Sequence, residues 1–133
     1  MIVGLGMDLV EITRIQRSLS RFGDHFLQKI LHPSECEALD LTHPFDPSAA
    51  SNAAARVAAR FAAKEAASKA LGTGFSQGIG LHDIRIYSEQ SGKPRLELFG
   101  KAREQAEKLG ATQILLTLTH SRDTAGAVVI LER

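Results

Sequence analysis

One short stretch of the chain combines a carboxylate with several positive charges. Residues 60–69 read RFAAKEAASK, so Lys64, Glu65 and Lys69 interrupt a run of small side chains. In a helix, Glu65 and Lys69 share one face. Arg60 and Lys64 share the neighbouring face. An acid flanked by cations on a rigid helix could hold a hard metal ion together with the phosphate that the ion bridges.

The same segment has a simpler interpretation. Glu65 followed by Lys69 is the favoured i,i+4 orientation of an ion pair, which stabilises a helix by about 0.2–0.5 kcal/mol and is common on solvated faces. Residues 60–69 alone leave both interpretations open, and a partner elsewhere in the chain would decide between them.

A second carboxylate, Asp8, is a candidate partner for Glu65. It ends an apolar opening segment, MIVGLGMD, that is typical of a short buried strand. Mg²⁺ takes oxygen ligands and usually binds one or two carboxylates together with substrate phosphates. Asp8 and Glu65 therefore form a candidate metal site, and the cations near Glu65 favour a phosphate ligand. The alternative role for Asp8 is to cap a helix that begins at Glu11.

The other reactive residue types carry weaker signals. The glycines of GLGMDL do not form a dinucleotide-binding fingerprint, because Leu9 stands where the third glycine is required. His120 ends an apolar segment, where a histidine is more often structural than catalytic, and the other histidines show no metal-ligand spacing. Cys36 is the only cysteine, so no intrachain disulfide can form, which fits a reducing compartment.

The composition is that of an ordinary globular domain. The 133 residues are 44% hydrophobic and 23% charged, and we expect a single domain spanning 1–133. A net charge of +1 gives no whole-protein attraction to nucleic acid or membranes, so neither is an expected partner. The N-terminal segment has no basic leader and is interrupted by acids, which predicts neither a signal peptide nor a membrane span, and hence a cytoplasmic protein.

Periodicity and capping signals predict the elements that must position the candidate site. Gly4 and Gly6 weaken the first strand and allow another backbone to approach it closely. The expected order of elements is β-ααα-ββ-α-ββ. Strands are expected at residues 2–8, 83–87, 95–99, 114–119 and 125–131. Helices are expected at residues 11–21, from 24, from 34 with a capping box to Glu37, from 51 or 52 to a stop at Gly72, and at 101–109.

Four blocks of the chain match one known family in the right order. They are IVGLGMDLVEITRI at the start, RFAAKEAASKALGTG in the middle, and GKPRL and LTLTHSRDTAGAVVILE near the end. With these blocks the chain resembles the holo-acyl-carrier-protein synthases, the short 4′-phosphopantetheinyl transferase family. The resemblance is weakest over residues 40–57, whose conformation the sequence does not predict. It implies an α+β fold, the 4′-phosphopantetheinyl transferase fold, in which a small antiparallel sheet packs on a long central helix.

The resemblance implies an enzyme with a specific reaction. Such an enzyme transfers the 4′-phosphopantetheine group of coenzyme A to a serine of apo acyl carrier protein, giving holo acyl carrier protein and 3′,5′-ADP. It would depend on Mg²⁺ and support fatty acid biosynthesis, a part of lipid metabolism. Asp8 and Glu65 would bind Mg²⁺, and Asp8, Glu65 and Lys69 would be the catalytic residues. The group that deprotonates the serine stays open among Asp8, Glu65 and a metal-bound water.

The resemblance also assigns the contacts with coenzyme A and with the carrier protein. Coenzyme A would be bound by Arg60, Lys64, Lys69, Gly92, Lys93, Pro94, Thr119, His120 and Ser121. Arg14, Arg17 and Arg21 would dock the acidic carrier protein, since complementary charge speeds encounter. Family members form homotrimers with active sites at subunit interfaces, and the resemblance implies the same here. The sequence does not indicate which carrier proteins are accepted or which metal serves in the cell.

Two functions from other classes are the alternatives. A noncatalytic module that binds coenzyme A or the carrier protein would keep Arg14 but lose the metal ligands, whereas this chain retains Asp8, Glu65 and Lys69 together. A structural α+β interaction domain would use Glu65 and Lys69 only as a surface ion pair. Protection by coenzyme A against thermal unfolding would separate a binding protein from the structural domain.

Overall fold

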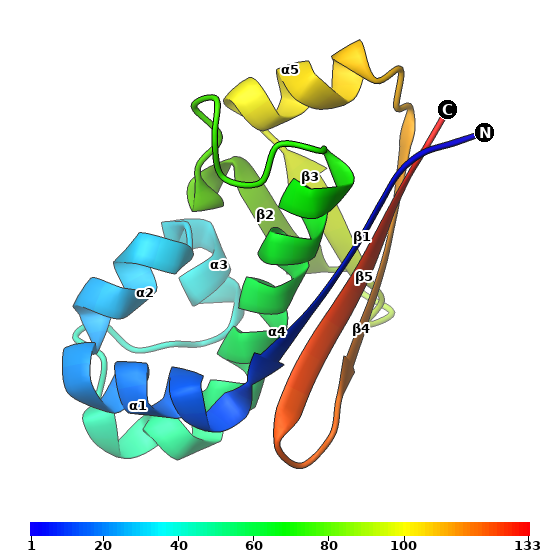
Figure 1. Cartoon of the computed structure of the whole chain (residues 1–133). Coiled ribbons are helices and arrows are strands. Elements are labelled where there is room, and N and C mark those ends of the chain that lie inside the picture. The colour runs from blue at the N-terminus through cyan, green and yellow to red at the C-terminus, as the bar shows by residue number, and fades with distance from the viewer.

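A long helix lies at the centre of the fold, between a sheet and a hairpin (Figure 1). The structure is a computed structural model that describes residues 1–133. The three-stranded antiparallel sheet has the order β1-β5-β4, with β1 at Ile2–Glu11, β5 at Thr124–Glu132 and β4 at Gln113–His120. The central helix α4 spans Ala50–Ala70 and packs on β1 and β5. The hairpin consists of β2 (Ile84–Ser88) and β3 (Pro94–Leu98), which contact α4 and β4 respectively.

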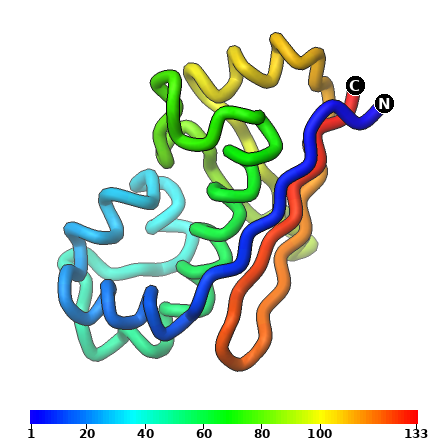
Figure 2. The backbone as a smooth tube through the Cα atoms, in the orientation of Figure 1, coloured from blue at the N-terminus to red at the C-terminus, as the bar shows by residue number.

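The remaining helices surround α4. Three short helices follow β1, namely α1 (Ile12–Phe22), α2 (Asp24–Ile30) and α3 (Pro33–Ala38), and α1 packs against α4. The helix α5 (Gly100–Lys108) lies beyond the hairpin, and the 3₁₀ turns η1 (Pro47–Ala49) and η2 (Leu81–Asp83) precede α4 and β2. Figure 2 shows β1 and β5 running side by side in opposite directions, with the two termini adjacent at one end of the sheet.

Small residues allow α4 to lie directly on β1. A Cβ atom on Gly4 would overlap the carbonyl oxygen of Ala70, and one on Gly6 would overlap that of Ala66. The glycines therefore permit the close backbone approach that the sequence predicts. Of the 21 residues of α4, 13 are buried, so this helix is enclosed on most sides rather than amphipathic. Asp8 follows the two glycines on the same face of β1 and is thereby directed toward α4.

The predicted α+β architecture is confirmed, with an antiparallel sheet packed on a long central helix. The order is β-αααα-ββ-α-ββ. All four helices expected before the hairpin are present, so the predicted order β-ααα-ββ-α-ββ counts one helix too few. Asp8 lies inside β1, which continues to Glu11, so it does not cap α1. The capping box of α3 joins His32 to Glu35, and Glu37 takes no part in it.

One face of the three-stranded sheet is not covered by the chain. Residues on β1 alternate, so that Gly4, Gly6 and Asp8 face α4 while Leu5, Met7 and Leu9 face outward. These three outward side chains are between 55% and 65% exposed. Leu115 of β4 is also exposed on this side of the sheet. No helix of the structure is both long and apolar enough to cross a membrane.

Candidate functional site

The structure brings Asp8 and Lys69 into contact at the junction of β1 and α4. Lys69 Nζ donates hydrogen bonds to Asp8 Oδ1 at 2.9 Å and to the carbonyl oxygen of Met7 at 3.0 Å. The side chain of Asp8 is 17% exposed and that of Lys69 is 52% exposed. The pair therefore lies at the surface with one side open to solvent, where a small anionic ligand can reach it.

Glu65 lies one helical turn before Lys69 and completes the cluster. Its carboxylate has no hydrogen bond or ion pair within the chain. Burial raises the pKa of Glu65, and the negative charge of Asp8 raises it further, against the opposing effect of Lys69 and Arg14. The predicted surface pair of Glu65 with Lys69 is not formed, because Lys69 reaches across to β1 instead.

The cluster has the donor set that Mg²⁺ prefers. Two carboxylates, those of Asp8 and Glu65, lie close enough for their charges to interact, and the carbonyl of Met7 is a third oxygen beside them. The positively charged ammonium group of Lys69 binds two of these oxygens, Asp8 Oδ1 and Met7 O. No group of three or more histidine, cysteine or carboxylate side chains is gathered as a metal site. Two carboxylates suit Mg²⁺, which takes its remaining ligands from water and phosphate.

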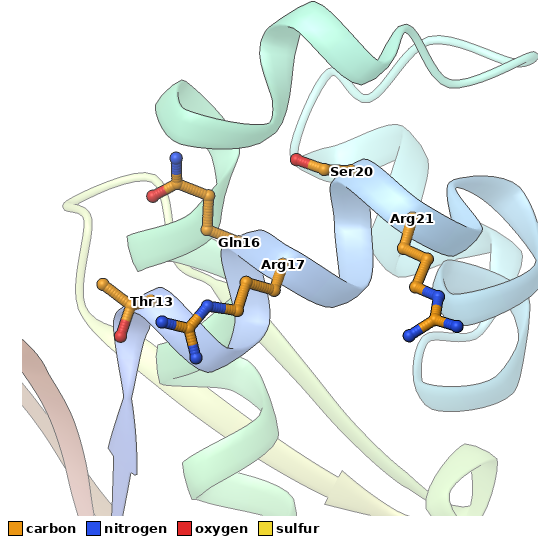
Figure 3. A pocket seen from close by; sticks show the side chains of 5 residues that line it. All are labelled: Thr13, Gln16, Arg17, Ser20 and Arg21. Atoms are coloured by element: carbon orange, nitrogen blue, oxygen red, sulfur yellow. The ribbon is translucent and has the colours of Figure 1, made fainter.

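The three predicted docking arginines form a stripe along α1. Arg14, Arg17 and Arg21 are all exposed and follow one another at i, i+3 and i+7, which places them on neighbouring positions of one helix face. Figure 3 shows the side chains of Arg17 and Arg21 extending to the same side of α1, away from Gln16 and Ser20. The charge of Arg14 also acts on Glu65, so the stripe begins beside the cluster.

The two predicted cofactor turns lie apart from each other. The turn between β4 and β5 carries exposed Thr119, His120 and Ser121, and it contacts the start of α1 through a hydrogen bond from Ile12 N to Asp123 O at 2.9 Å. The turn of the β2–β3 hairpin carries Gly92 and Lys93, both exposed, and then Pro94. Lys93 and Pro94 line a hollow together with residues 112–116, at the start of β4, and no residue of the Asp8 cluster lines it.

Known proteins match this chain along its full length. A family model described as the 4′-phosphopantetheinyl transferase superfamily matches residues 4–128, which includes Asp8, Glu65, Lys69 and both turns.

The chain belongs to the 4′-phosphopantetheinyl transferase superfamily.

Relatives with known names and structures agree with this assignment. A holo-[acyl-carrier-protein] synthase of Maridesulfovibrio salexigens is 50% identical over 133 residues, which is 100% of both chains. The crystal structure of the synthase from Neisseria meningitidis is 32% identical, with a TM-score of 0.81 and 100% coverage of both chains. The structure from Bacillus anthracis, described as a complex with CoA (3′,5′-ADP), is 34% identical, with a TM-score of 0.75 and coverage of 98% and 96%. The predictions of an enzyme and of a phosphopantetheinyl transferase fold are confirmed.

Lys64 of this phosphopantetheinyl transferase is not placed to bind a cofactor, and that prediction is wrong. Its side chain is fully buried, and Nζ donates to Glu35 Oε1 at 2.7 Å, to Leu81 O at 2.8 Å and to Ile84 O at 2.6 Å. An ammonium group has three donors, so none is left for a ligand. Burial lowers the pKa of Lys64, and the charge of Glu35 opposes this effect.

Arg60, the other basic residue on that side of α4, remains available. It is half-buried, has no hydrogen-bond or ion-pair partner, and lies near Arg56 and Glu35. Burial lowers the pKa of Arg60, and the charge of Arg56 adds to this effect. A guanidinium group without a partner can bind a phosphate in a bidentate manner. The binding of coenzyme A by Arg60 therefore agrees with its surroundings and stays a prediction.

Glu35 is a residue of the transferase that the sequence analysis did not single out. Its Oε1 accepts from His32 N and from Lys64 Nζ, and its Oε2 accepts from Ile86 N at 3.0 Å. The sequence carried an indirect signal, because a lysine within an alanine-rich buried helix requires an acidic partner. It did not show which of the 15 acidic residues that partner is.

Proposed function

We propose that the chain is a Mg²⁺-dependent holo-acyl-carrier-protein synthase, which transfers 4′-phosphopantetheine from coenzyme A to a serine of apo acyl carrier protein. The observation that carries this proposal is the cluster of Asp8, Glu65 and Lys69 at the junction of β1 and α4. It combines two carboxylates for a metal with a half-exposed cation for phosphate. The relative from Bacillus anthracis, described with CoA (3′,5′-ADP), supports the cofactor and the leaving group.

In the proposed reaction the serine hydroxyl oxygen forms a bond to the phosphorus that carries the pantetheine group. The bond from that phosphorus to the oxygen of 3′,5′-ADP breaks, and the serine proton is lost. Mg²⁺ bound by Asp8 and Glu65 would neutralise charge on the pyrophosphate oxygens. Lys69, next to Asp8, would provide a further positive charge as negative charge moves to the leaving group.

Glu65 is the proposed acceptor of the serine proton. Its carboxylate has no partner within the chain, so an oxygen of Glu65 can accept the proton directly or through a water molecule. Asp8 is less suited to this role because its carboxylate already accepts a hydrogen bond from Lys69.

The proposed binding site for coenzyme A consists of residues that lie apart from one another within one chain. Arg60 and the segments 92–94 and 119–121 are the proposed contacts, and the two turns lie at different ends of β4. The proposed homotrimer would cover the outward face of β1, where Leu5, Met7 and Leu9 are exposed, and would place turns of one subunit beside the cluster of another. An exposed apolar face of this kind marks an interaction surface.

The acyl carrier protein would dock on the arginine stripe of α1. Acyl carrier proteins are acidic, and Arg14, Arg17 and Arg21 present positive charge that begins beside Glu65. The docked serine would then lie next to the proposed metal site. The product, holo acyl carrier protein, would serve fatty acid biosynthesis in the cytoplasm.

The test is to incubate the protein with apo acyl carrier protein, coenzyme A and Mg²⁺ and to weigh the carrier protein by mass spectrometry. We expect the mass of one added phosphopantetheine, together with release of 3′,5′-ADP, and no addition when EDTA is present. If coenzyme A protects the protein against thermal unfolding but no carrier protein gains mass, the chain is a binding module instead of a transferase.

A further inference from the structure

The buried pair of Lys64 and Glu35 occupies a particular place in the fold. Both side chains are almost completely buried, at 0% and 2% exposure. Together they contact four segments, because Lys64 belongs to α4, Glu35 to α3, Leu81 to η2, and Ile84 with Ile86 to β2. Removing two charges from water is costly, so the burial of this pair is not explained by stability alone.

The pair closes the free edge of β2. Ile84 O accepts from Lys64 Nζ, and Ile86 N donates to Glu35 Oε2. A residue of a neighbouring parallel strand would supply the same donor and acceptor to two residues spaced in this way. The ammonium and the carboxylate therefore stand where a third strand would pair, on an edge that otherwise has unpaired backbone groups.

The pair supplies the hydrogen bonds between the hairpin and the neighbouring helices. The sheet of β2 and β3 has two strands and is not hydrogen-bonded to the three-stranded sheet. A two-stranded sheet alone is marginally stable in water, so packing and anchoring contacts decide how it sits. The hydrogen bond from Lys64 Nζ to Ile84 O and the one from Ile86 N to Glu35 Oε2 are the ones that join either hairpin strand to the helices α3 and α4. Apolar packing of β3 against β4 is less directional.

We propose that the Lys64–Glu35 pair positions the β2–β3 hairpin against α4 for the binding of coenzyme A. This inference rests on the proposed function, in which Arg60 of α4 and Gly92 and Lys93 of the hairpin turn contact coenzyme A. The pair links these two parts of the site through fixed, directional contacts. It touches no substrate, so it acts by positioning: the distance between hairpin turn and helix is set before the cofactor binds.

The test compares three variants with the wild-type protein. Lys64→Met removes the ammonium group and leaves the buried carboxylate of Glu35 without its counter-ion. The double variant Lys64→Met with Glu35→Gln removes both charges and keeps a side-chain oxygen at position 35 that can accept from Ile86 N. Leu27→Ala, in the buried part of α2, lowers stability without touching the pair and is the matched control.

Two measurements are made below the melting temperature of every variant. We expect Lys64→Met to raise the KM for coenzyme A about tenfold or more with a smaller change in kcat, since misplacing a binding element costs affinity. Amide hydrogen exchange over residues 84–98 should accelerate in the same variant. The double variant should restore both quantities part of the way, and Leu27→Ala should leave both at wild-type values despite its lower melting temperature.

A wild-type KM and wild-type hairpin exchange in folded Lys64→Met would overturn the proposal, as would an equal rise of KM in Leu27→Ala. If Lys64→Met does not fold, the double variant decides the question. A wild-type KM and wild-type hydrogen exchange in the double variant would mean that the hairpin does not need the ion pair, and would overturn the proposal. If the wild-type protein transfers nothing, the proposed function fails. The exchange of residues 84–98, measured without coenzyme A, still reports whether the pair anchors the hairpin.

Discussion

Two adjacent residues of α4, Lys64 and Glu65, have opposite surroundings. Lys64 points toward α3 and the hairpin, is fully buried, and has all three of its donors satisfied. Glu65 points toward β1, is partly exposed, and has no partner for its carboxylate while its pKa is raised. A rotation of about 100° around a helix therefore separates a charge used for structure from one available for chemistry.

The difference shows what distinguishes a site from an ordinary ion pair. A buried charge that is completely satisfied has nothing left to offer a ligand, whereas an acid that is partly desolvated and unpaired is poised for a proton or a metal. Lys69 is intermediate, since it bonds to Asp8 and Met7 O but remains about half exposed at 52%. Substitutions on the two sides of α4 should therefore have separable effects.

The largest effect is expected for Glu65→Ala. Loss of a metal ligand and proton acceptor should lower kcat/KM for carrier-protein modification by about 10³–10⁴-fold, because each role contributes strongly to the rate. The melting temperature should stay close to the wild-type value. Glu37→Ala, at an exposed position of α3, is the control and should be fully active. Full activity of Glu65→Ala would remove Glu65 from the proposed site.

A matched pair of substitutions should separate structure from chemistry. Lys64→Met should reduce the free energy of unfolding by about 3–5 kcal/mol, because it leaves a buried carboxylate unpaired. Lys69→Met should change it by less than about 1 kcal/mol, as expected for a half-exposed ion pair, while reducing transfer activity strongly. Urea denaturation and the mass assay measure the two quantities. Equal destabilisation by both substitutions would contradict the difference between the two sides of α4.

A smaller effect is expected from the arginine stripe. Arg17→Glu should raise the KM for acyl carrier protein about tenfold, with stronger dependence on salt in the wild type than in the variant, and leave the KM for coenzyme A unchanged. Arg17 is preferable to Arg14 because the charge of Arg14 also acts on Glu65. Lys108→Glu on α5 makes the same charge reversal elsewhere and should have little effect. An equal loss of affinity for both substrates would exclude α1 as the docking helix.

The smallest effect is a pH-dependent difference in stability. The folded state raises the pKa of Glu65 above its ordinary 4.5, so ionised Glu65 is disfavoured by folding and stability is lost as the pH rises through the folded pKa. Without metal, Glu65→Gln should therefore melt slightly above wild type at pH 7–8. The difference should vanish below about pH 4.5, where the acid is neutral in both states. A variant that melts below wild type at neutral pH would contradict the unpaired state of Glu65.

Much of the fold was predictable because local patterns agree with it. The glycines at 4 and 6 and the alanines of α4 predict a close strand–helix contact, and the structure shows Gly6 against Ala66. Helix and strand positions are mostly within one to three residues of the predictions. The predicted capping box of α3 was wrong, since the cap uses His32 and Glu35 in place of Ser34 and Glu37.

The candidate site was predicted less completely. Asp8, Glu65 and Lys69 were named together, and the structure gathers them. Lys64 was assigned to the cofactor, because its spacing on a helix does not reveal that α3 and β2 enclose it. Its partner Glu35 is 29 residues away in the chain and was not identified.

The sequence by itself determined the family, the α+β architecture, and the residue types at the candidate site, because hydrophobic periodicity, glycine positions and motif order are written locally along the chain. The tertiary structure alone decided which charges are satisfied and which remain free. Lys64 and Lys69 are both lysines of one helix with similar sequence surroundings. One is enclosed with a carboxylate and two carbonyls, and the other is half open beside Asp8. Burial and partners depend on segments distant in sequence, and they set the cost of a charge and its chemistry.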